Sequence, residues 1–421
     1  MESSERAVSL YVHVPFCTDK CLYCDFFSVR CRTVPEETRA AVVDQTIRQA
    51  ASLMDSLQAA EAATIFIGGG TPSVLSRPLL ERLISAFEGL KPGEWTVEAN
   101  PESVDEAFLD ICASRGVTRL SLGVQSLRDE RLRLLRRPCR RKDILGALEL
   151  VSKRWAGDLN LDYIAGIPGQ TTVEVREDLA EILEFAPSHV SLYQLTTEPG
   201  TEFEKALARG TIVPNPAELD EELWFQGCAE LERAGFQHYE ISNFCLPRKE
   251  CRHNLRYWRL EPYLGVGPGA VSTIPAGAAV RAFPGARDAL ERAAAVRLTS
   301  PRDFTSFLEG EPRRWNMEVE ALAPADFLLE TLMMGFRLAE GIPRASFEKR
   351  FGRTFEELFP GLWARWEEKG LASPTREALR LTEQGRMFLD ALLGEVIDCV
   401  DPSTMPALAV SWPSGRHAPG D

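Results

Sequence analysis

Long hydrophobic stretches are absent from this sequence of 421 residues, and no apolar run approaches the length that a membrane span requires. The first residues, Met-Glu-Ser-Ser-Glu, are acidic and do not resemble a secretory signal. Basic residues are outnumbered, and the net charge of −14 argues against a broad surface for nucleic-acid phosphates. Ten scattered cysteines are too few for a disulfide scaffold. We therefore expect a cytoplasmic protein that binds no nucleic acid, with peripheral membrane association left open.

Three of the cysteines form a compact group near the start of the chain. Cys17, Cys21 and Cys24 follow an apolar run, Val8–Val14, with the spacing C-x3-C-x2-C. Thiolates are the ligands of iron–sulfur clusters, and three of them leave one iron of a [4Fe-4S] cluster without a protein ligand. The alternative is a structural zinc site, but such sites take four protein ligands and no fourth cysteine or histidine follows at short range.

The first two-thirds of the chain alternates between short apolar runs and amphipathic segments. Strands are predicted at residues 8–14, 63–67, 95–99, 118–124, 158–164 and 189–195, with helices between them. This rhythm predicts βαβ units and a parallel sheet, and six such units suggest an incomplete (β/α) barrel of the TIM type. In such a fold the functional side chains gather at the carboxyl ends of the strands.

Polar residues do occur at those strand ends. Gly68-Gly69-Gly70-Thr71 follows one predicted strand, and Glu98, Gln125 and Asp162 lie at the ends of others. Glycines let a backbone approach a ligand closely, although three glycines are just as often a turn. A carboxylate in an apolar strand is costly unless it is paired or faces a wet pocket, so each one alone is equally well a capped strand end.

A histidine lies beside two aromatic residues in His253-Asn254-Leu255-Arg256-Tyr257-Trp258. Haem iron takes axial histidine and aromatic rings pack on a porphyrin, so a haem contact at His253 is one interpretation. A buried, hydrogen-bonded histidine in an aromatic core is the commoner situation.

The string Tyr-x-His-x-Pro-Phe-Cys-x3-Cys-x-Tyr-Cys resembles the signature of the radical S-adenosylmethionine (SAM) superfamily, and in particular its branch of oxygen-independent coproporphyrinogen III oxidases and their relatives. The resemblance implies a [4Fe-4S] cluster on Cys17, Cys21 and Cys24, whose open iron holds SAM, and a reductant for that cluster. It also implies that the SAM site is lined by Tyr11, Tyr23, Gly69, Gly70, Thr71, Glu98, Gln125, Arg137, Asp162 and Thr196. We expect Arg137, in a basic helix over residues 128–141, to grip the SAM carboxylate.

The motif H-N-x-x-Y-W at His253–Trp258 resembles that of the haem chaperones within this branch. The oxidases themselves carry a further cysteine where this chain has Phe26, and a longer segment before the cluster motif. The resemblance therefore implies a chaperone that binds haem, with His253 as the haem contact, and passes it to an acceptor protein. The alternative is the oxidase activity itself, decarboxylation of coproporphyrinogen III to protoporphyrinogen IX, and whether the protein turns over a substrate stays open.

We expect four segments along the chain. Residues 1–275 form the radical SAM barrel, 276–320 a connection, 321–400 a smaller, mainly helical and winged-helix-like domain, and 401–421 a disordered tail rich in Pro and Ser.

Overall fold

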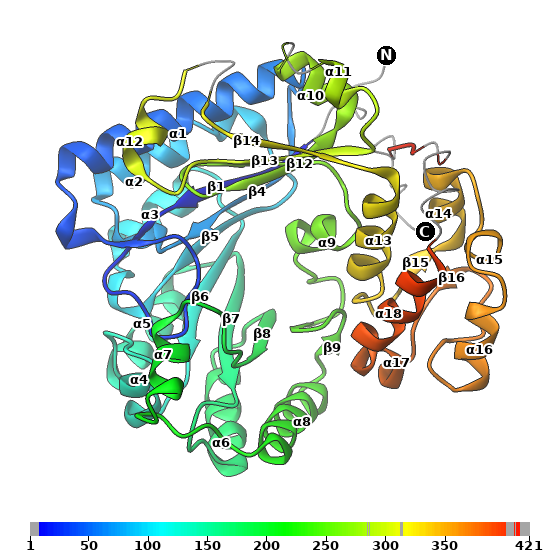
Figure 1. The fold of residues 1–421 in the computed structure, drawn as a ribbon. Coiled ribbons are helices and arrows are strands. Elements are labelled where there is room, and N and C mark those ends of the chain that lie inside the picture. Colours follow the sequence, from blue (N-terminus) through cyan, green and yellow to red (C-terminus); the bar gives the residue numbers. More distant parts are fainter. Residues whose placement is uncertain are drawn as a thin grey trace.

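A parallel sheet with helices on its outer side forms the centre of the molecule in the computed structural model (Figure 1). The structure describes residues 8–283, 285, 287–311, 315–400, 408 and 410–412. The parallel strands are β1 (Val8–Val14), β4 (Ala62–Gly69), β5 (Trp95–Ala99), β6 (Arg119–Gln125), β7 (Asp158–Ala165), β8 (His189–Gln194) and β11 (Tyr263–Val266). Their apolar runs fit strands that are buried along most of their length.

The helices that connect these strands lie where the amphipathic segments predict them. They are α1 (Glu36–Ser56), α2 (Arg77–Ser85), α3 (Glu106–Ser114), α5 (Arg141–Arg154), α6 (Thr172–Leu183) and α8 (Ala217–Arg233). Short 3-10 turns, η2 (Cys31–Thr33), η3 (Pro72–Val74), η4 (Glu88–Leu90) and η5 (Pro101–Ser103), complete the loops. The prediction of an α/β fold of the partial (β/α)6 barrel type is therefore confirmed.

One side of β1 pairs with β11, a strand that lies far away in the sequence. The sheet has the order β14-β13-β12-β11-β1-β4-β5-β6-β7-β8-β10-β9, so the first strand of the chain lies inside it. Antiparallel strands extend both edges, namely β9 (Gln237–His238), β10 (Asn243–Cys245), β12 (Val271–Pro275), β13 (Ala295–Thr299) and β14 (Glu318–Leu322). The segment that we expected to be a connection thus contributes β13 and part of β14 to the main sheet, together with α10 (Ala276–Ala282), α11 (Arg287–Leu290) and α12 (Phe304–Leu308). The domain boundaries themselves stay predictions.

The basic stretch at residues 128–141 is not one helix, and that expectation was wrong. It forms α4 (Asp129–Leu134), and α5 begins only at Arg141. Between them Arg136 has a left-handed backbone (φ +57°) and the Arg137 N–H bonds the Leu132 carbonyl at 2.9 Å. This turn ends the helix and directs the Arg137 side chain inward, where it is 9% exposed.

The C-terminal region builds its own aromatic core beside α9 (Arg252–Trp258), on the right in Figure 1. It contains a two-stranded sheet, β15 (Ile342–Pro343) with β16 (Ala378–Leu379), and the helices α13 (Pro324–Gly335), α14 (Arg344–Phe351), α15 (Phe355–Leu358), α16 (Leu362–Glu368), α17 (Glu383–Met387) and α18 (Leu389–Cys399). Rings such as Phe336, Phe355, Trp363 and Trp366 pack within about 6 Å of one another. Helices with a small hairpin-like sheet agree with the predicted C-terminal fold.

Most of the predicted tail, residues 401–407, 409 and 413–421, lies outside the described residues. Of the remainder, the Trp412 ring packs against Phe327 with ring centres 5.0 Å apart. None of the helices in the described part of the chain combines the length and the apolar character that crossing a bilayer requires.

Candidate functional site

The three cysteines of the N-terminal motif line a common cavity of about 510 Å³ at the carboxyl ends of the strands. Cys17 ends β2 (Phe16–Cys17), which pairs with β3 (Val29–Arg30), and Cys21 and Cys24 follow in the loop between these strands. Two backbone bonds anchor this loop: the Leu22 N–H bonds Leu135 O at 3.0 Å, and the Leu22 carbonyl accepts from Phe203 N at 2.9 Å. Phe203 belongs to α7 (Glu202–Ala208), so the loop is held from two sides.

The chemistry of these thiols fits an iron–sulfur cluster. Burial raises the pKa of Cys17 and brings that of Cys24 to about 11, so both are protonated until a metal displaces the proton. Across the described ranges no group of three or more His, Cys, Asp or Glu side chains could hold one metal ion. Three thiols on one cavity wall supply the ligands that an iron–sulfur cluster takes, in which each thiolate binds its own iron.

The glycine loop after β4 packs directly against the cysteine-bearing strand. Gly70 N bonds Val14 O at 2.8 Å, and Thr71 N bonds Phe16 O at 2.7 Å. Gly69 has φ +105°, and the His13 ring occupies the space in which a Cβ atom at Gly69 would lie. Thr71 also directs its hydroxyl toward Cys17, with Oγ1 3.8 Å from Sγ. Backbone of the glycine loop and cluster thiols thus form one surface of the cavity.

Arg137 and Asn100 connect this surface to the neighbouring strands. Arg137 Nη2 donates to Asn100 Oδ1 at 2.8 Å and to Gly123 O at 2.9 Å, and Nη1 lies 3.5 Å from Cys21 Sγ. Asn100 in turn donates to Thr71 Oγ1 at 2.8 Å. No sequence motif assigned a role to Asn100; its position two residues after Glu98 at a strand end was the available signal.

Two carboxyl groups face the cavity from β5 and β7. Burial, reinforced by the charge of Asp162, raises the pKa of Glu98 to about 8, and its Oε2 accepts from Gly69 N at 3.0 Å. Burial also raises the pKa of Asp162 to about 6, although hydrogen bonds from Ser191 and Asn160 oppose the shift. The stronger upward shift of the Glu98 pKa favours its protonated form, which can donate a hydrogen bond, whereas Asp162 accepts from Asn160.

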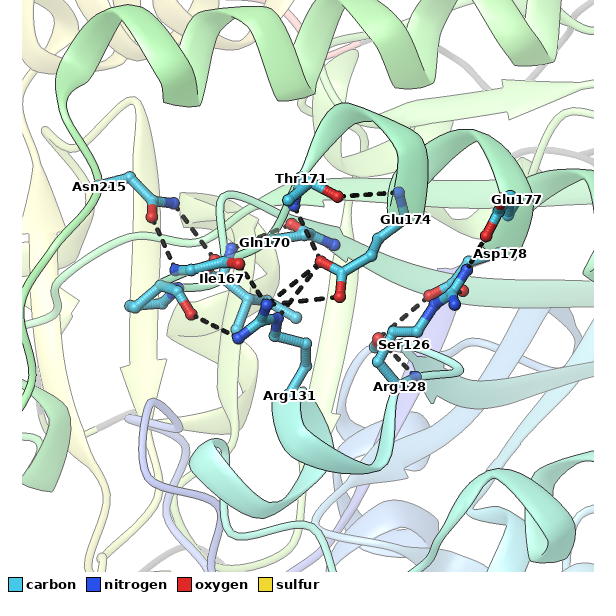
Figure 2. Close-up of polar contacts among 12 residues, drawn as sticks. Ser126, Arg128, Arg131, Ile167, Gln170, Thr171, Glu174, Glu177, Asp178 and Asn215 are labelled. Carbon is cyan, nitrogen blue, oxygen red and sulfur yellow. Dashed lines mark hydrogen bonds and ion pairs between the residues drawn. The ribbon is translucent and has the colours of Figure 1, made fainter.

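Gln125 ends β6 with a strained backbone that a buried network holds in place. Its φ is +65°, which is uncommon for a residue with a side chain. Buried Asp178 of α6 holds the residues that directly follow Gln125. It accepts from Ser126 Oγ at 3.1 Å and Arg128 Nε at 2.7 Å (Figure 2). It also accepts from Leu127 N at 2.9 Å. Tyr163 OH adds a fourth bond at 3.2 Å.

The same network fixes the loop after β7. Arg131 donates to the Pro168 carbonyl of this loop and to the carboxylate of Glu174 (Figure 2). Asn215 bonds the loop as well, accepting from Gly169 N and donating to Ile167 O. Gln170 closes it by donating to Ile164 O at 3.2 Å and accepting from Ile167 N at 3.1 Å. α4, which precedes Arg137, is therefore tied both to α6 and to the end of β7.

A second cavity of about 500 Å³ continues into the interior of the half-barrel. We call it the lumen cavity; it shares Gly69, Glu98, Asp162, Tyr193 and Phe26 with the first. Its walls are aromatic on one side, with Tyr11, Phe66, Tyr257 and Tyr263. On the other side a chain of hydrogen bonds descends from Asp162 through Asn160 (2.8 Å) to His189 (2.6 Å) and Tyr239 (2.8 Å).

The structure brings most of the predicted site residues together. The cavity of the cysteines is also lined by Tyr23, Gly69, Gly70, Thr71, Glu98, Gln125, Arg137, Asp162 and Thr196. Tyr11 instead lines the lumen cavity, where its hydroxyl lies 2.9 Å from His13 Nδ1. Which of these residues contact SAM stays a prediction. The other residues of the lumen were missed because they are spread over β1, β4, β5, β6, β7, β8 and β11 and form no local pattern in the sequence.

His253 does not line either cavity but lies behind the aromatic wall of the lumen cavity, with its ring centre 5.2 Å from that of Phe66. It is 1% exposed, with Nδ1 2.8 Å from Thr64 Oγ1 and Nε2 2.9 Å from Tyr257 OH. Burial lowers its pKa to about 3, so the ring is neutral. Contact between this ring and a haem iron requires one of these two bonds to break, and the haem contact at His253 stays a prediction.

The half-barrel, the cysteine cavity and the glycine loop define a radical SAM protein, and comparisons with known proteins agree. The family model of the Radical SAM superfamily matches residues 11–186, and that of the HemN C-terminal domain matches residues 322–388. The solved coproporphyrinogen III oxidase HemN of Escherichia coli superposes with a TM-score of 0.73, covering 93% of this chain and 90% of that chain at 20% identity, a likeness of fold alone.

Named relatives show to which family within the radical SAM proteins the chain belongs. "Heme chaperone HemW" of Escherichia coli is 35% identical over 92% of this chain and 97% of the relative, and "Heme chaperone HemW" of Bacillus subtilis is 31% identical over 92% and 100%. The chain belongs to this family of radical SAM haem chaperones within the oxidase-like branch. Membership implies a [4Fe-4S] cluster and SAM, which the cysteine cavity fits.

Proposed function

We propose that this protein binds haem and transfers it to an acceptor protein, on a scaffold that holds a [4Fe-4S] cluster and SAM. The observation that carries the proposal is the identity of 35% to a named haem chaperone along 92% of the chain, through both the barrel and the C-terminal region. Haem, the acceptor and a reductant for the cluster are thus the proposed partners, and membrane association would be peripheral.

In this proposal Cys17, Cys21 and Cys24 hold the cluster. When present, the cluster would bind SAM at its open iron and supply an electron to the sulfonium. Arg137 presents its guanidinium beside the cluster loop and suits the SAM carboxylate. The Gly69–Thr71 backbone approaches the same space, and protonated Glu98 supplies a donor. Gln125 and Asp162 suit the ribose hydroxyls.

Phe26 supports the chaperone over the oxidase. It occupies the position at which the oxidases carry a further cysteine, and its side chain is 60% exposed where the two cavities meet. An exposed aromatic ring at the mouth of a cavity suits contact with a planar apolar ligand.

The proposal is tested on protein reconstituted without oxygen. Haem is added and the Soret band followed; the loaded protein is then mixed with apomyoglobin, and coproporphyrinogen III is supplied with SAM and reductant in parallel. We expect a stable Soret band, transfer to the apoprotein, and no protoporphyrinogen. Conversion of coproporphyrinogen at enzymatic rates would establish the oxidase activity instead. Failure to bind haem would refute the proposed chaperone function.

His253 is the proposed haem contact, and Tyr257 offers a matched comparison. If iron binds Nε2, the bond from Tyr257 must break first. His253→Ala should then lose haem affinity, whereas Tyr257→Phe should keep or increase it because the competing hydroxyl is gone. Full haem affinity in His253→Ala would remove this contact and leave the rest of the proposal standing.

A further inference from the structure

Arg119 lies at the floor of the lumen cavity, at the end of β6 away from the cysteines. The strand begins at Arg119 and ends at Gln125, so the two side chains are separated by about 20 Å along it. Arg119 lines the lumen cavity and is 3% exposed. Gln125, in contrast, lines the cavity of the cysteines. The floor is therefore a part of the barrel that the proposed SAM site does not use.

The guanidinium of Arg119 is buried without a direct ion pair to any carboxylate of the described residues. Nη1 donates to Lys249 O over 3.4 Å, Nη2 is buried with no hydrogen-bond partner, and no ion pair joins it to a carboxylate of the described chain. A guanidinium cannot shed its proton in a protein, so this charge is present at every relevant pH. Buried charges in folded proteins are otherwise paired.

The negative charges of Glu94 and Asp158 help to raise the pKa of Arg119, but both carboxylates form their direct bonds with other groups. Glu94 accepts from the backbone N–H groups of Arg252 (3.0 Å) and His253 (2.9 Å), at the start of α9. Asp158 forms an ion pair with Lys249 Nζ at 2.7 Å. Nearby polar groups of the lumen, such as His189, already have two partners. Arg119 thus has favourable charges nearby but no carboxylate bonded to its guanidinium, and its Nη2 is left without a partner.

We propose that the floor of the lumen cavity is a carboxylate-binding subsite with Arg119 as its anchor, and that it receives a propionate of the haem. Arg119 is a planar fork that matches a carboxylate with two parallel hydrogen bonds. The aromatic wall of Tyr11, Phe66, Tyr257 and Tyr263 suits the apolar body of a tetrapyrrole. This inference rests on the proposed function and adds to it a second point of contact for haem, separate from His253.

The propionate and the anchor can be removed independently. Wild type and Arg119→Gln are each titrated with haem and with haem dimethyl ester, after reconstitution of the cluster. We expect Arg119→Gln to bind haem at least tenfold more weakly, and wild type to bind the ester with a similar loss. Arg119→Gln should show no further loss with the ester, because both changes remove the same contact. Arg119→Lys should be intermediate.

Controls separate this contact from a loss of fold. Arg154→Gln removes an exposed arginine that pairs with Asp110 and should bind haem as wild type does. Cluster absorbance and thermal unfolding show whether Arg119→Gln folds, and the comparison of haem with its ester on wild type needs no variant.

Several results would overturn the subsite. Equal haem affinity in wild type and Arg119→Gln, or an ester penalty that is the same in both, removes it while haem binding remains. Loss of SAM affinity in Arg119→Gln with haem affinity unchanged assigns the carboxylate to SAM instead. A wild type that binds no haem refutes the proposed function, and the subsite with it.

Discussion

Arg137 Nη1 lies 3.5 Å from the sulfur of Cys21, while the other terminal nitrogen of the same guanidinium holds Asn100 and the Gly123 carbonyl. One side chain therefore connects the cluster loop to the ends of β5 and β6. A substitution at Arg137 therefore tests whether these contacts contribute to ligand binding in the cavity.

Arg137→Lys should weaken SAM binding about tenfold, equivalent to ~1.4 kcal/mol, and leave the iron content unchanged. Lysine keeps the charge but cannot make the two in-plane bonds of a guanidinium. Equilibrium binding of SAM to reconstituted protein measures the effect. The matched control is Arg136→Lys, because Arg136 is the exposed neighbour in the same turn. Identical SAM affinity in both variants would show that Arg137 has no part in binding.

Cys24→Ser should abolish a stable [4Fe-4S] cluster, since serine is a poor ligand for iron–sulfur clusters and two thiolates remain. Iron and labile sulfide per chain after oxygen-free reconstitution measure the loss. Cys31→Ser is the control, because Cys31 is also a free thiol near the loop but lies outside the cavity lining. A full iron content in Cys24→Ser, or stoichiometric zinc in the wild type, would contradict the cluster assignment.

Asp178→Asn should destabilise the protein by about 3–5 kcal/mol and weaken SAM binding as well. The carboxylate is 1% exposed and accepts from four donors, and the change leaves some of them unpaired beside strained Gln125. Chemical denaturation gives the stability, and SAM titration gives the effect on the site. In comparison, Glu177→Gln removes only the exposed partner of Arg128 and should cost less than ~1 kcal/mol. An equal loss of unfolding free energy in the two variants would mean that the buried Asp178 carboxylate contributes no more to stability than the exposed Glu177 carboxylate.

Acidification should destabilise the fold partly through His253. Its pKa is about 3 in the folded chain, far below the ordinary value of 6.5, because burial disfavours the charged ring. The unfolded chain takes up a proton below pH 6.5 and the folded chain does not, so unfolding becomes easier as the pH falls toward 3. Relative to His253→Gln, the wild type should lose about 1.4 kcal/mol of unfolding free energy per pH unit between pH 6 and 4. Parallel pH profiles for the two proteins would argue against a neutral buried ring.

Residues at strand ends were predictable because each carries its own local signal. Glu98, Gln125 and Asp162 interrupt apolar runs, and parallel strands bring their carboxyl ends to one edge of the sheet, which is where the structure places them. The cysteines were predictable for the same reason, since their spacing is local. Arg137 was placed in the site only through family resemblance. The turn that directs its side chain inward has Arg136, not glycine, in the left-handed conformation, so the sequence gives no signal for it.

Features that depend on distant parts of the chain were not predictable in this way. Arg119 looks like an ordinary first residue of a strand. That no carboxylate bonds its guanidinium is visible only in the structure, in which Glu94 and Asp158 bond other groups. Strands β13 and β14 were missed because Arg297 in β13, and Glu318 and Glu320 in β14, interrupt the apolar pattern. Their identity as strands is set by pairing with β12, which is a tertiary property.

The strand that leads into the cysteine loop occupies an interior place in the sheet, and its two neighbours are synthesised at very different times. Val12 of β1 pairs with Ile67 on one side and with Val266 on the other. On the ribosome the first partner emerges early, whereas the second appears only after more than half of the chain has been made. The cysteine loop thus gains its complete support late in biogenesis, and a nascent chain exposes an unfinished sheet edge beside its metal ligands until then.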